Sequence, residues 1–295
     1  MAGCVARHRN RPIVERVWGT FGTGRGQFRK PRAVAIDPED RLYIVDTTAR
    51  IQVFDRDGRY LRGWSTPESA YGNPSGLGWD REGNLLVADT HYSRVLVYRR
   101  TGHLLEDRTL GGSTGAAPGQ FHFVTDAVQD AAGNYYVAEY GNIDRIQKLS
   151  PEGHFLCQWG TNGDAPGQFN RPNSLALDAS GHLWVADASN HRIQVFDTSE
   201  EPPRLVLVWG AEGSGPGQLR YPYDVWPAED GIVYVAEFGN HRIQKFTREG
   251  EPLAVAGGPG REPGQFYQPW GLAVDSEGAI HVMDTYNHRV QRIRF

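Results

Sequence analysis

Short apolar runs of about five residues, each ended by an acidic side chain, recur along the whole chain. Segments rich in Gly, Pro and Asp separate them, which is the pattern of β-strands joined by turns. The acidic residues that end the runs are Asp46, Asp89, Glu139, Asp187, Glu237 and Asp284. Each is followed four to six residues later by an arginine: Arg50, Arg94, Arg145, Arg192, Arg242 and Arg289. The chain therefore consists of six copies of one unit of about 48 residues.

Each copy contains four strand-like runs. In the fourth copy they cover residues 174–178, 183–187, 192–196 and 205–209, with the turn residues Ala179-Ser180-Gly181 between the first two. Four strands in about 48 residues is the size of one blade of a β-propeller.

The N-terminal segment supplies the strand that the last copy lacks. The last copy stops at Phe295, after its third strand, and the chain begins with an apolar run at 13–18 that matches the fourth strands elsewhere. We predict an all-β fold, a six-bladed β-propeller of four-stranded antiparallel blades, in which the N-terminal strand 13–19 pairs with the C-terminal blade and closes the ring. Residues 13–295 form this single domain, and residues 1–12 are expected to be a flexible N-terminal segment.

Composition agrees with this fold and excludes several functions. The 36 Gly and 18 Pro suit a chain of many turns, and a net charge of −4 excludes a protein that binds nucleic acid or membrane over its whole surface. No apolar run approaches the roughly 20 residues of a membrane span, so the chain as written is expected to be soluble. The native compartment is unknown, but Met1-Ala2-Gly3-Cys4 resembles the end of a bacterial lipoprotein signal. If a leader had been removed, the protein would be exported or lipid-anchored through Cys4.

The pattern of the repeat combines Gly-Gln-Phe, a Pro, an apolar strand ending in Val-Ala-Asp or Val-Ala-Glu, and Asn-His-Arg-Ile-Gln, with substitutions in most copies. The fourth copy has Val185-Ala186-Asp187 and Asn190-His191-Arg192-Ile193-Gln194. This pattern resembles the NHL repeat family of six-bladed β-propellers over about residues 13 to 295. The resemblance implies the fold but no single function, because NHL propellers include RNA-binding modules, protein-interaction and sensor domains, and the lyase that completes peptide amidation.

Residues that recur in every copy are expected to serve the fold. The acidic residue and the arginine of each copy flank the turn between second and third strands and are expected to form an ion pair. The histidines of the Asn-His-Arg copies, His191, His241 and His288, are expected to be surface turn residues, since six repeated turns do not converge on one metal ion. Four fourth-strand tryptophans are expected to pack between blades: Trp18, Trp64, Trp159 and Trp209.

The position after the repeated Pro varies most between copies, and it should lie at the mouth of the central channel on the face of the long inter-blade loops. In order it is Arg32, Ser75, Thr125, Asn173, Tyr223 and Trp270, and the next position is Ala33, Gly76, Asp126, Ser174, Asp224 and Gly271. Sites usually lie on loops that a rigid scaffold holds. We predict a ligand site made of Arg32, Thr125, Asp126, Asn173, Tyr223, Asp224 and Trp270, and no site on the opposite face of short hairpin turns.

The resemblance to the amidating lyase also raises a metal hypothesis. Its zinc histidines occupy the position after the Pro, where no copy of this chain has His, so neither zinc nor that activity is expected. An adjacent Asp serves a calcium site in that lyase, and Asp126 and Asp224 match it. With Asn173, these residues would hold calcium or another divalent cation. The alternative is that each Asp caps a backbone amide or neutralises Arg32.

These observations rank three functions. The first is a non-catalytic scaffold, expected to be a monomer, that binds a protein, a peptide or a small polar ligand at its loop face and channel mouth. The second is a metal-dependent lyase or hydrolase with a cation at that mouth. The third is an RNA-binding module. Only the first loop is clearly basic, with Arg25, Arg29, Lys30 and Arg32, whereas Arg171 is balanced by Asp164, so nucleic acid is not the expected partner.

Overall fold

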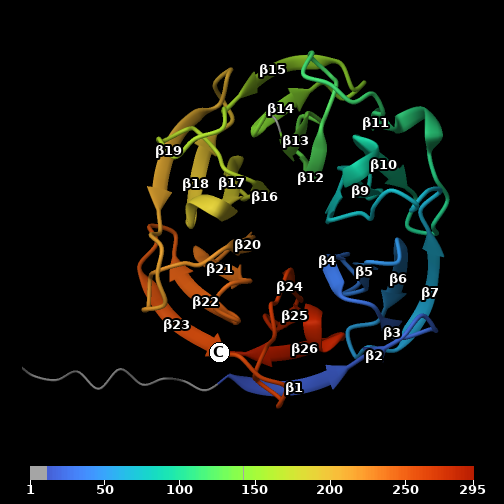
Figure 1. Ribbon diagram of the computed structural model, residues 1–295, viewed down its shortest axis with the longest axis vertical. Helices are drawn as coiled ribbons and strands as arrows, with labels where there is room; N and C mark the ends of the chain where they lie inside the picture. Colours follow the sequence, from blue (N-terminus) through green and yellow to red (C-terminus); the bar gives the residue numbers. More distant parts are fainter. Residues whose placement is uncertain (1–11, 142) are drawn as a thin grey trace, which may run out of the picture.

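Six four-stranded antiparallel sheets stand around a central channel in the computed structural model, which describes residues 12–141 and 143–295 (Figure 1). The predicted all-β six-bladed propeller is confirmed. Each sheet runs outward from the channel, and β4, β12, β16, β20 and β24 are labelled nearest the centre in Figure 1. The predicted lipid-anchor residue Cys4 and nearly all of the predicted flexible segment 1–12 lie outside the described residues.

The strands follow the order of the repeats. The first three blades are β4 (Pro31–Ile36), β5 (Leu42–Asp46), β6 (Arg50–Phe54) and β7 (Tyr60–Ser65); β8 (Gly76–Trp79), β9 (Leu85–Asp89), β10 (Arg94–Tyr98) and β11 (Leu110–Gly111); and β12 (Phe123–Gln129), β13 (Tyr135–Tyr140), β14 (Arg145–Leu149) and β15 (Phe155–Trp159). The next two are β16 (Pro172–Leu177), β17 (His182–Asp187), β18 (Arg192–Asp197) and β19 (Arg204–Trp209); and β20 (Pro222–Pro227), β21 (Ile232–Glu237), β22 (Arg242–Thr247) and β23 (Pro252–Gly257). The sixth consists of β24 (Leu272–Val274), β25 (Ile280–Asp284), β26 (Arg289–Arg294) and β1 (Ile13–Trp18).

Short elements complete the ring. They are the parallel pair β2 (Thr20–Phe21) and β3 (Gln27–Phe28), and the 3₁₀ turns η1 (Thr90–Tyr92), η2 (Glu106–Arg108), η3 (Ala188–Asn190) and η4 (Thr285–Asn287). The second blade departs most from the repeat, because its fourth strand β11 has only two residues and follows η2. This is also the copy in which Ser69-Ala70-Tyr71 replaces Gly-Gln-Phe.

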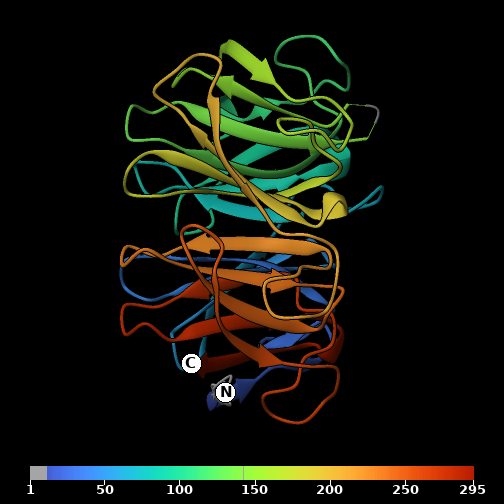
Figure 2. The ribbon, with the colours of Figure 1, turned by 90° about the vertical axis from the view of Figure 1, so that its left-hand side faces the viewer.

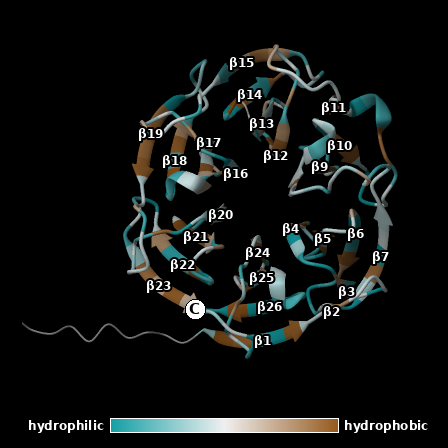
Figure 3. Ribbon diagram, viewed as in Figure 1, coloured by the Kyte–Doolittle hydropathy of each residue, from teal (hydrophilic) through white to brown (hydrophobic). Residues whose placement is uncertain are grey.

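The hydrophobic core lies between the blades. Each cluster of buried apolar side chains joins two neighbouring sheets, as where Tyr136 of β13 meets Leu183 of β17. The fourth-strand tryptophans add to this packing: Trp18 packs on Phe54 of the next blade, with ring centroids 4.5 Å apart and the rings tilted by 46°. Figure 3 shows the consequence, with apolar residues concentrated in strands such as β18 and polar residues in many connections. Blade packing, predicted for these tryptophans, is confirmed.

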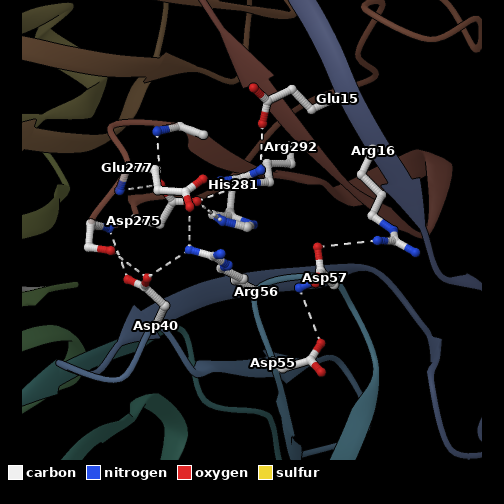
Figure 4. A network of polar contacts seen from close by, with 12 residues as sticks. Glu15, Arg16, Asp40, Asp55, Arg56, Asp57, Asp275, Glu277, His281 and Arg292 are labelled. Atoms are coloured by element: carbon white, nitrogen blue, oxygen red, sulfur yellow. Dashed lines mark hydrogen bonds and ion pairs between the residues drawn. The ribbon is translucent and has the colours of Figure 1, made fainter.

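The N-terminal strand closes the ring. β1 pairs antiparallel with β26, from Ile13 opposite Arg294 to Trp18 opposite Val290. Figure 4 shows the polar network around this junction. Glu15 of β1 pairs with Arg292 of β26 (2.6 Å), and Arg16 pairs with Asp57 of the first blade (3.2 Å). The closing strand is therefore tied to both blades that it joins.

The six predicted ion pairs of the repeat are present. Their nitrogen–oxygen distances lie between 2.5 and 2.9 Å, in Asp46–Arg50, Asp89–Arg94, Glu139–Arg145, Asp187–Arg192, Glu237–Arg242 and Asp284–Arg289. Each carboxylate is buried. In the fourth blade Arg192 also donates to the carbonyl oxygens of Ala165 and Gln168. The pair therefore anchors the preceding inter-blade loop as well as its own turn.

Seen from the side, the ring is a thick disc with connections projecting from both faces (Figure 2). One face carries the hairpin turns between first and second strands. The other carries the inter-blade loops and the turns between second and third strands, and we call it the loop face. No helix in the described residues is long and apolar enough to cross a membrane.

Candidate ligand-binding site

The innermost strands enclose a channel with a hollow of about 270 Å³. Its walls are mostly small or apolar, including Ala33, Leu77 and Val225. The polar and aromatic residues among its lining include Asp126, Asn173, Ser174, Tyr223, Asp224 and Trp270, which come from the varied positions of the repeat. Of the seven residues predicted to form the ligand site, Asp126, Asn173, Tyr223, Asp224 and Trp270 line this hollow, whereas Arg32 and Thr125 do not. Ligand binding by these residues stays a prediction.

Three of the predicted site residues form one cluster at the loop-face end of this channel. The Arg32 guanidinium lies 4.9 Å from the centroid of the Trp270 ring. Tyr223 meets Trp270 edge to face at 4.7 Å and stacks on Phe238 at 4.4 Å. The cluster joins the first, fifth and sixth blades, so side chains nearly 240 residues apart share one surface. We call Arg32, Tyr223 and Trp270, together with Arg171, the mouth cluster.

Arg32 is partly buried, and within the described residues its guanidinium forms neither an ion pair nor a hydrogen bond. Burial lowers the pKa of Arg32 from its ordinary value, and the nearby guanidinium of Arg171 lowers it further. Tyr140, Tyr223 and Tyr286 surround it and oppose this shift. An arginine keeps its charge in such a place because its pKa is so high. The mouth therefore carries a positive charge that forms no ion pair with a carboxylate of the described residues.

Arg171 belongs to the same cluster, although the sequence analysis paired it with Asp164. Its guanidinium lies 5.0 Å from the ring centroid of Tyr140 and 5.6 Å from that of Tyr223. Its Nε is buried without a hydrogen-bond partner, and the described residues hold no ion pair between Arg171 and Asp164. One signal was available: Arg171 precedes the repeated Pro, as does Lys30 of the basic first loop.

Asp126 and Asp224 instead connect neighbouring blades below the mouth. Asp126 accepts the backbone N–H of Leu175 in the next blade at 2.9 Å. Asp224 accepts the N–H of Leu272 in its next blade at 2.8 Å, and also the hydroxyl of Ser174 at 2.7 Å. The innermost strands shift register just before both residues, at bulges that turn these carboxylates toward the neighbouring strand.

Thr125 and Asn173 serve the same connections. The Thr125 hydroxyl donates to the carbonyl oxygen of Pro172 (2.6 Å), and the Asn173 amide nitrogen donates to that of Tyr223 (2.8 Å). The hydrogen bonds thus favour amide capping over the cation site predicted from Asp126, Asn173 and Asp224. Across residues 12–141 and 143–295, no group of three or more His, Cys, Asp or Glu side chains could hold a metal ion. The cation site stays a prediction, and no chemistry is derived from it.

Asp224 gives the protein a measurable pH dependence. Burial raises its pKa to about 6, although three hydrogen bonds lower it, whereas an unfolded Asp titrates near 3.9. The folded protein therefore binds this proton more tightly, so the stabilisation is fully present below about pH 4 and is lost as the pH rises through about 6. Between pH 4 and 7 we expect the wild type to lose about 2–3 kcal/mol relative to Asp224→Asn. Urea unfolding at each pH measures this, and a pH-independent difference would contradict it.

The histidines of the repeat join blades too, a role that the prediction of surface turn residues missed. The Nδ1 atoms of His191, His241 and His288 accept the backbone N–H of Tyr221, Gln268 and Lys30, at 2.9 to 3.0 Å. The donors have positive φ angles between 50° and 56° and directly precede the repeated Pro. Burial lowers the pKa of all three histidines, which favours the neutral ring that this bond requires.

The hairpin-turn face has a wide hollow of about 1020 Å³, where no site was predicted. Asp37, Asp80, Asp178 and Asp275 line it, and each accepts backbone N–H groups of its own turn, as Asp37 does from Arg41 at 2.9 Å. These carboxylates are thus engaged in turn structure. The two ends of the channel differ in charge, acidic at the hairpin turns and basic at the mouth cluster.

The comparisons with known proteins match this architecture. The NHL repeat model matches residues 169–196 and 266–293. The chain is 32% identical over 148 residues to NHL repeat-containing protein 3 of Homo sapiens, covering 48% of this chain and 42% of that protein. It is also 32% identical over 151 residues to peptidyl-glycine alpha-amidating monooxygenase B of Xenopus laevis, covering 50% of this chain and 16% of that protein. The chain thus spans less than half the length of these curated relatives.

Solved structures share the fold at low sequence identity. An auxiliary nutrient binding protein from Bacteroides thetaiotaomicron superimposes with a TM-score of 0.70 at 16% identity, covering 94% of this chain and 75% of that one. Virginiamycin B lyase from Staphylococcus aureus has a TM-score of 0.60 at 12% identity, covering 90% of this chain and 95% of that one. The fold and the repeats define the class of this protein, a six-bladed β-propeller. More particularly, NHL repeats match at residues 169–196 and 266–293, and the chain is similar to NHL repeat-containing protein 3, so the predicted resemblance to the NHL repeat family is confirmed.

Proposed function

We propose that this protein is a non-catalytic binding scaffold, and that its ligand or partner binds at the loop-face mouth of the channel. The observation that carries the proposal is the mouth cluster, in which the Arg32 guanidinium and the Arg171 Nε have no hydrogen-bond partner among the described residues and lie beside Trp270 and Tyr223. Concave sites that combine aromatic walls with a few convergent polar groups are typical of ligand binding.

The rigidity of the surroundings supports the proposal. Hydrogen bonds that Asp126 and Asp224 accept from backbone amides of neighbouring blades fix the strands below the mouth, and Tyr223 contacts both Phe238 and Trp270. A site that is held before binding loses little side-chain entropy when the ligand arrives. Fold alone does not choose between binding and catalysis, since the similar structures include both a nutrient binding protein and a lyase.

A ligand screen against matched tryptophan variants tests the placement. Peptides and polar metabolites are screened for those that raise the unfolding temperature, because a molecule that binds the folded state stabilises it. We expect Trp270→Ala to abolish the shift. Trp226→Ala is the control, because Trp226 lies toward the hairpin-turn end of the same channel. If the shifts persist in Trp270→Ala and vanish in Trp226→Ala, the ligand binds the opposite end and the proposal fails.

A further inference from the structure

A second hollow of about 360 Å³ opens at the loop-face mouth, where the first and sixth blades meet. Its lining includes three basic residues, Arg29, Lys30 and Arg32, and three aromatic ones, Phe21, Trp270 and Tyr286. No Asp or Glu in the described part of the chain lines it. We call it the junction hollow.

Each basic side chain of the junction hollow lies over an aromatic ring of the same hollow. The Arg29 guanidinium is 5.8 Å from the Phe21 centroid, the Lys30 ammonium is 4.3 Å from that of Tyr286, and Arg32 is 4.9 Å from that of Trp270. A ring face attracts a cation and holds it in place, but it does not neutralise the charge or occupy its N–H donors.

None of the three forms an ion pair with any residue that the structure describes. Many other arginines of this protein do form ion pairs, as Arg41, Arg56 and Arg100 do. His288 also lines the hollow, but it differs in charge from Arg29, Lys30 and Arg32. Burial lowers its pKa, as do Lys30 and Arg29, and its Nδ1 accepts the N–H of Lys30, so it adds no charge at neutral pH. The hollow therefore carries three uncompensated positive charges inside an aromatic wall.

From this arrangement we propose that the junction hollow binds a small organic phosphate, a phosphate monoester whose carbon body packs on the aromatic rings. The inference rests on the proposed function, since the hollow opens at the same mouth. A phosphate monoester carries about 1.5 to 2 negative charges at pH 7 and three acceptor oxygens. Arginine side chains bind such oxyanions through several N–H donors at once, and Lys30 adds a point charge. A single carboxylate would leave part of the positive charge unbalanced.

A series of ligands that share a benzene ring but carry groups of different charge tests whether the hollow prefers a phosphate monoester. Phenyl phosphate, benzoate, benzyl alcohol and benzylamine are titrated by calorimetry at constant ionic strength, together with inorganic phosphate. We expect phenyl phosphate to bind at least tenfold more tightly than benzoate or inorganic phosphate, and the neutral and cationic compounds not to bind. Equal affinity for benzoate and phenyl phosphate, or tighter binding of inorganic phosphate, would overturn the proposal.

Variants locate the site. We expect Lys30→Gln and Arg32→Gln each to weaken phenyl phosphate binding at least tenfold, equivalent to about 1.4 kcal/mol. The matched control is Arg25→Gln, which removes one charge from the same loop, where Arg25 lies over Tyr60 of the outermost strand β7. An equal loss in the control would mean that overall charge alone attracts the ligand, and the proposal would fail. Thermal unfolding of each variant confirms that it is folded.

Two further outcomes distinguish a failure of the phosphate inference from a failure of the proposed function. If a neutral ligand from the screen depends on Trp270 while phenyl phosphate does not bind, the mouth is a binding site but the phosphate inference is wrong. If no ligand of any charge depends on Trp270, the proposed function fails as well. Binding of single-stranded RNA that tightens with length and is not displaced by phenyl phosphate would also overturn the inference, because the phosphates of a strand would then be the ligand.

Discussion

Replacing Arg145 by Met should lower the free energy of unfolding by about 3–5 kcal/mol. Arg145 and Glu139 are both buried, with side-chain exposures of 1% and 0%, and their charged atoms are 2.7 Å apart. Arg145 also donates to the carbonyl oxygen of Gln120, which anchors the preceding loop. Without the guanidinium, a buried carboxylate loses its counter-charge, and this penalty exceeds the loss of the ion pair itself. Urea unfolding followed by tryptophan fluorescence measures the change.

A surface pair provides the control for Arg145. Arg59 pairs with Asp55 at 3.2 Å, but its side chain is 79% exposed, so Arg59→Met is expected to change stability by less than about 1 kcal/mol. Adding Glu139→Gln to Arg145→Met should restore part of the loss, because the amide oxygen still accepts the N–H of His122 without an unpaired charge. If Arg145→Met lowered the free energy of unfolding no more than the surface control does, the ion pair with Glu139 would not stabilise the fold as proposed.

The second large effect concerns closure of the ring. Trp18→Ala is expected to reduce the free energy of unfolding by about 3 kcal/mol, as large-to-small substitutions at packed tryptophans do. Trp18 packs on Phe28 of β3 and on Phe54 of the first blade, and it belongs to the strand that pairs with β26. Amide exchange of Val290 and its neighbours in β26 should accelerate. When β1 detaches, the backbone amides of β26 that bond to it become exposed to solvent.

Two controls separate closure from general destabilisation. Ile13 lies in the same strand but is 65% exposed, so Ile13→Thr should leave stability nearly unchanged. Trp159 occupies the corresponding place in the third blade and packs on Phe196, so Trp159→Ala removes similar packing away from the junction. Its amide exchange should accelerate around β14 and β15 and leave β26 protected. If both tryptophan variants affect β26 equally, the closing strand has no special part in holding the ring.

The propeller itself could be predicted from the sequence because its determinants are local. Alternating strands and turns, the 43- to 50-residue spacing and the acidic–arginine pairs all lie within single copies. The closing strand was also predictable, since the chain lacked one strand at its end and had a matching run at 13–18. Arg32, Tyr223 and Trp270 lie at a position of the repeat that varies between copies. Because a residue that varies between blades is not required by the blade fold, this position indicated a functional role.

The roles of the channel residues could not be predicted in the same way. Asp126, Asp224 and the histidines of the repeat bond to atoms 27 to 258 residues away, in the neighbouring blade. Whether such a carboxylate reaches a backbone amide of the neighbouring blade depends on a register shift of one residue in the innermost strand. For that reason both alternatives, a cation site and amide capping, are compatible with the sequence alone.

The sequence by itself determined the number of blades, their internal pairing, the closing strand and the positions where function was to be sought. Only the tertiary structure decided which of those side chains meet. It turned Asp126 and Asp224 toward backbone amides and set Arg171 beside Tyr223, away from Asp164. It also placed the charges of the first loop over aromatic rings from the last blade. The physical reason is that each blade is specified by neighbours in sequence, whereas the mouth cluster is assembled from single residues of several blades.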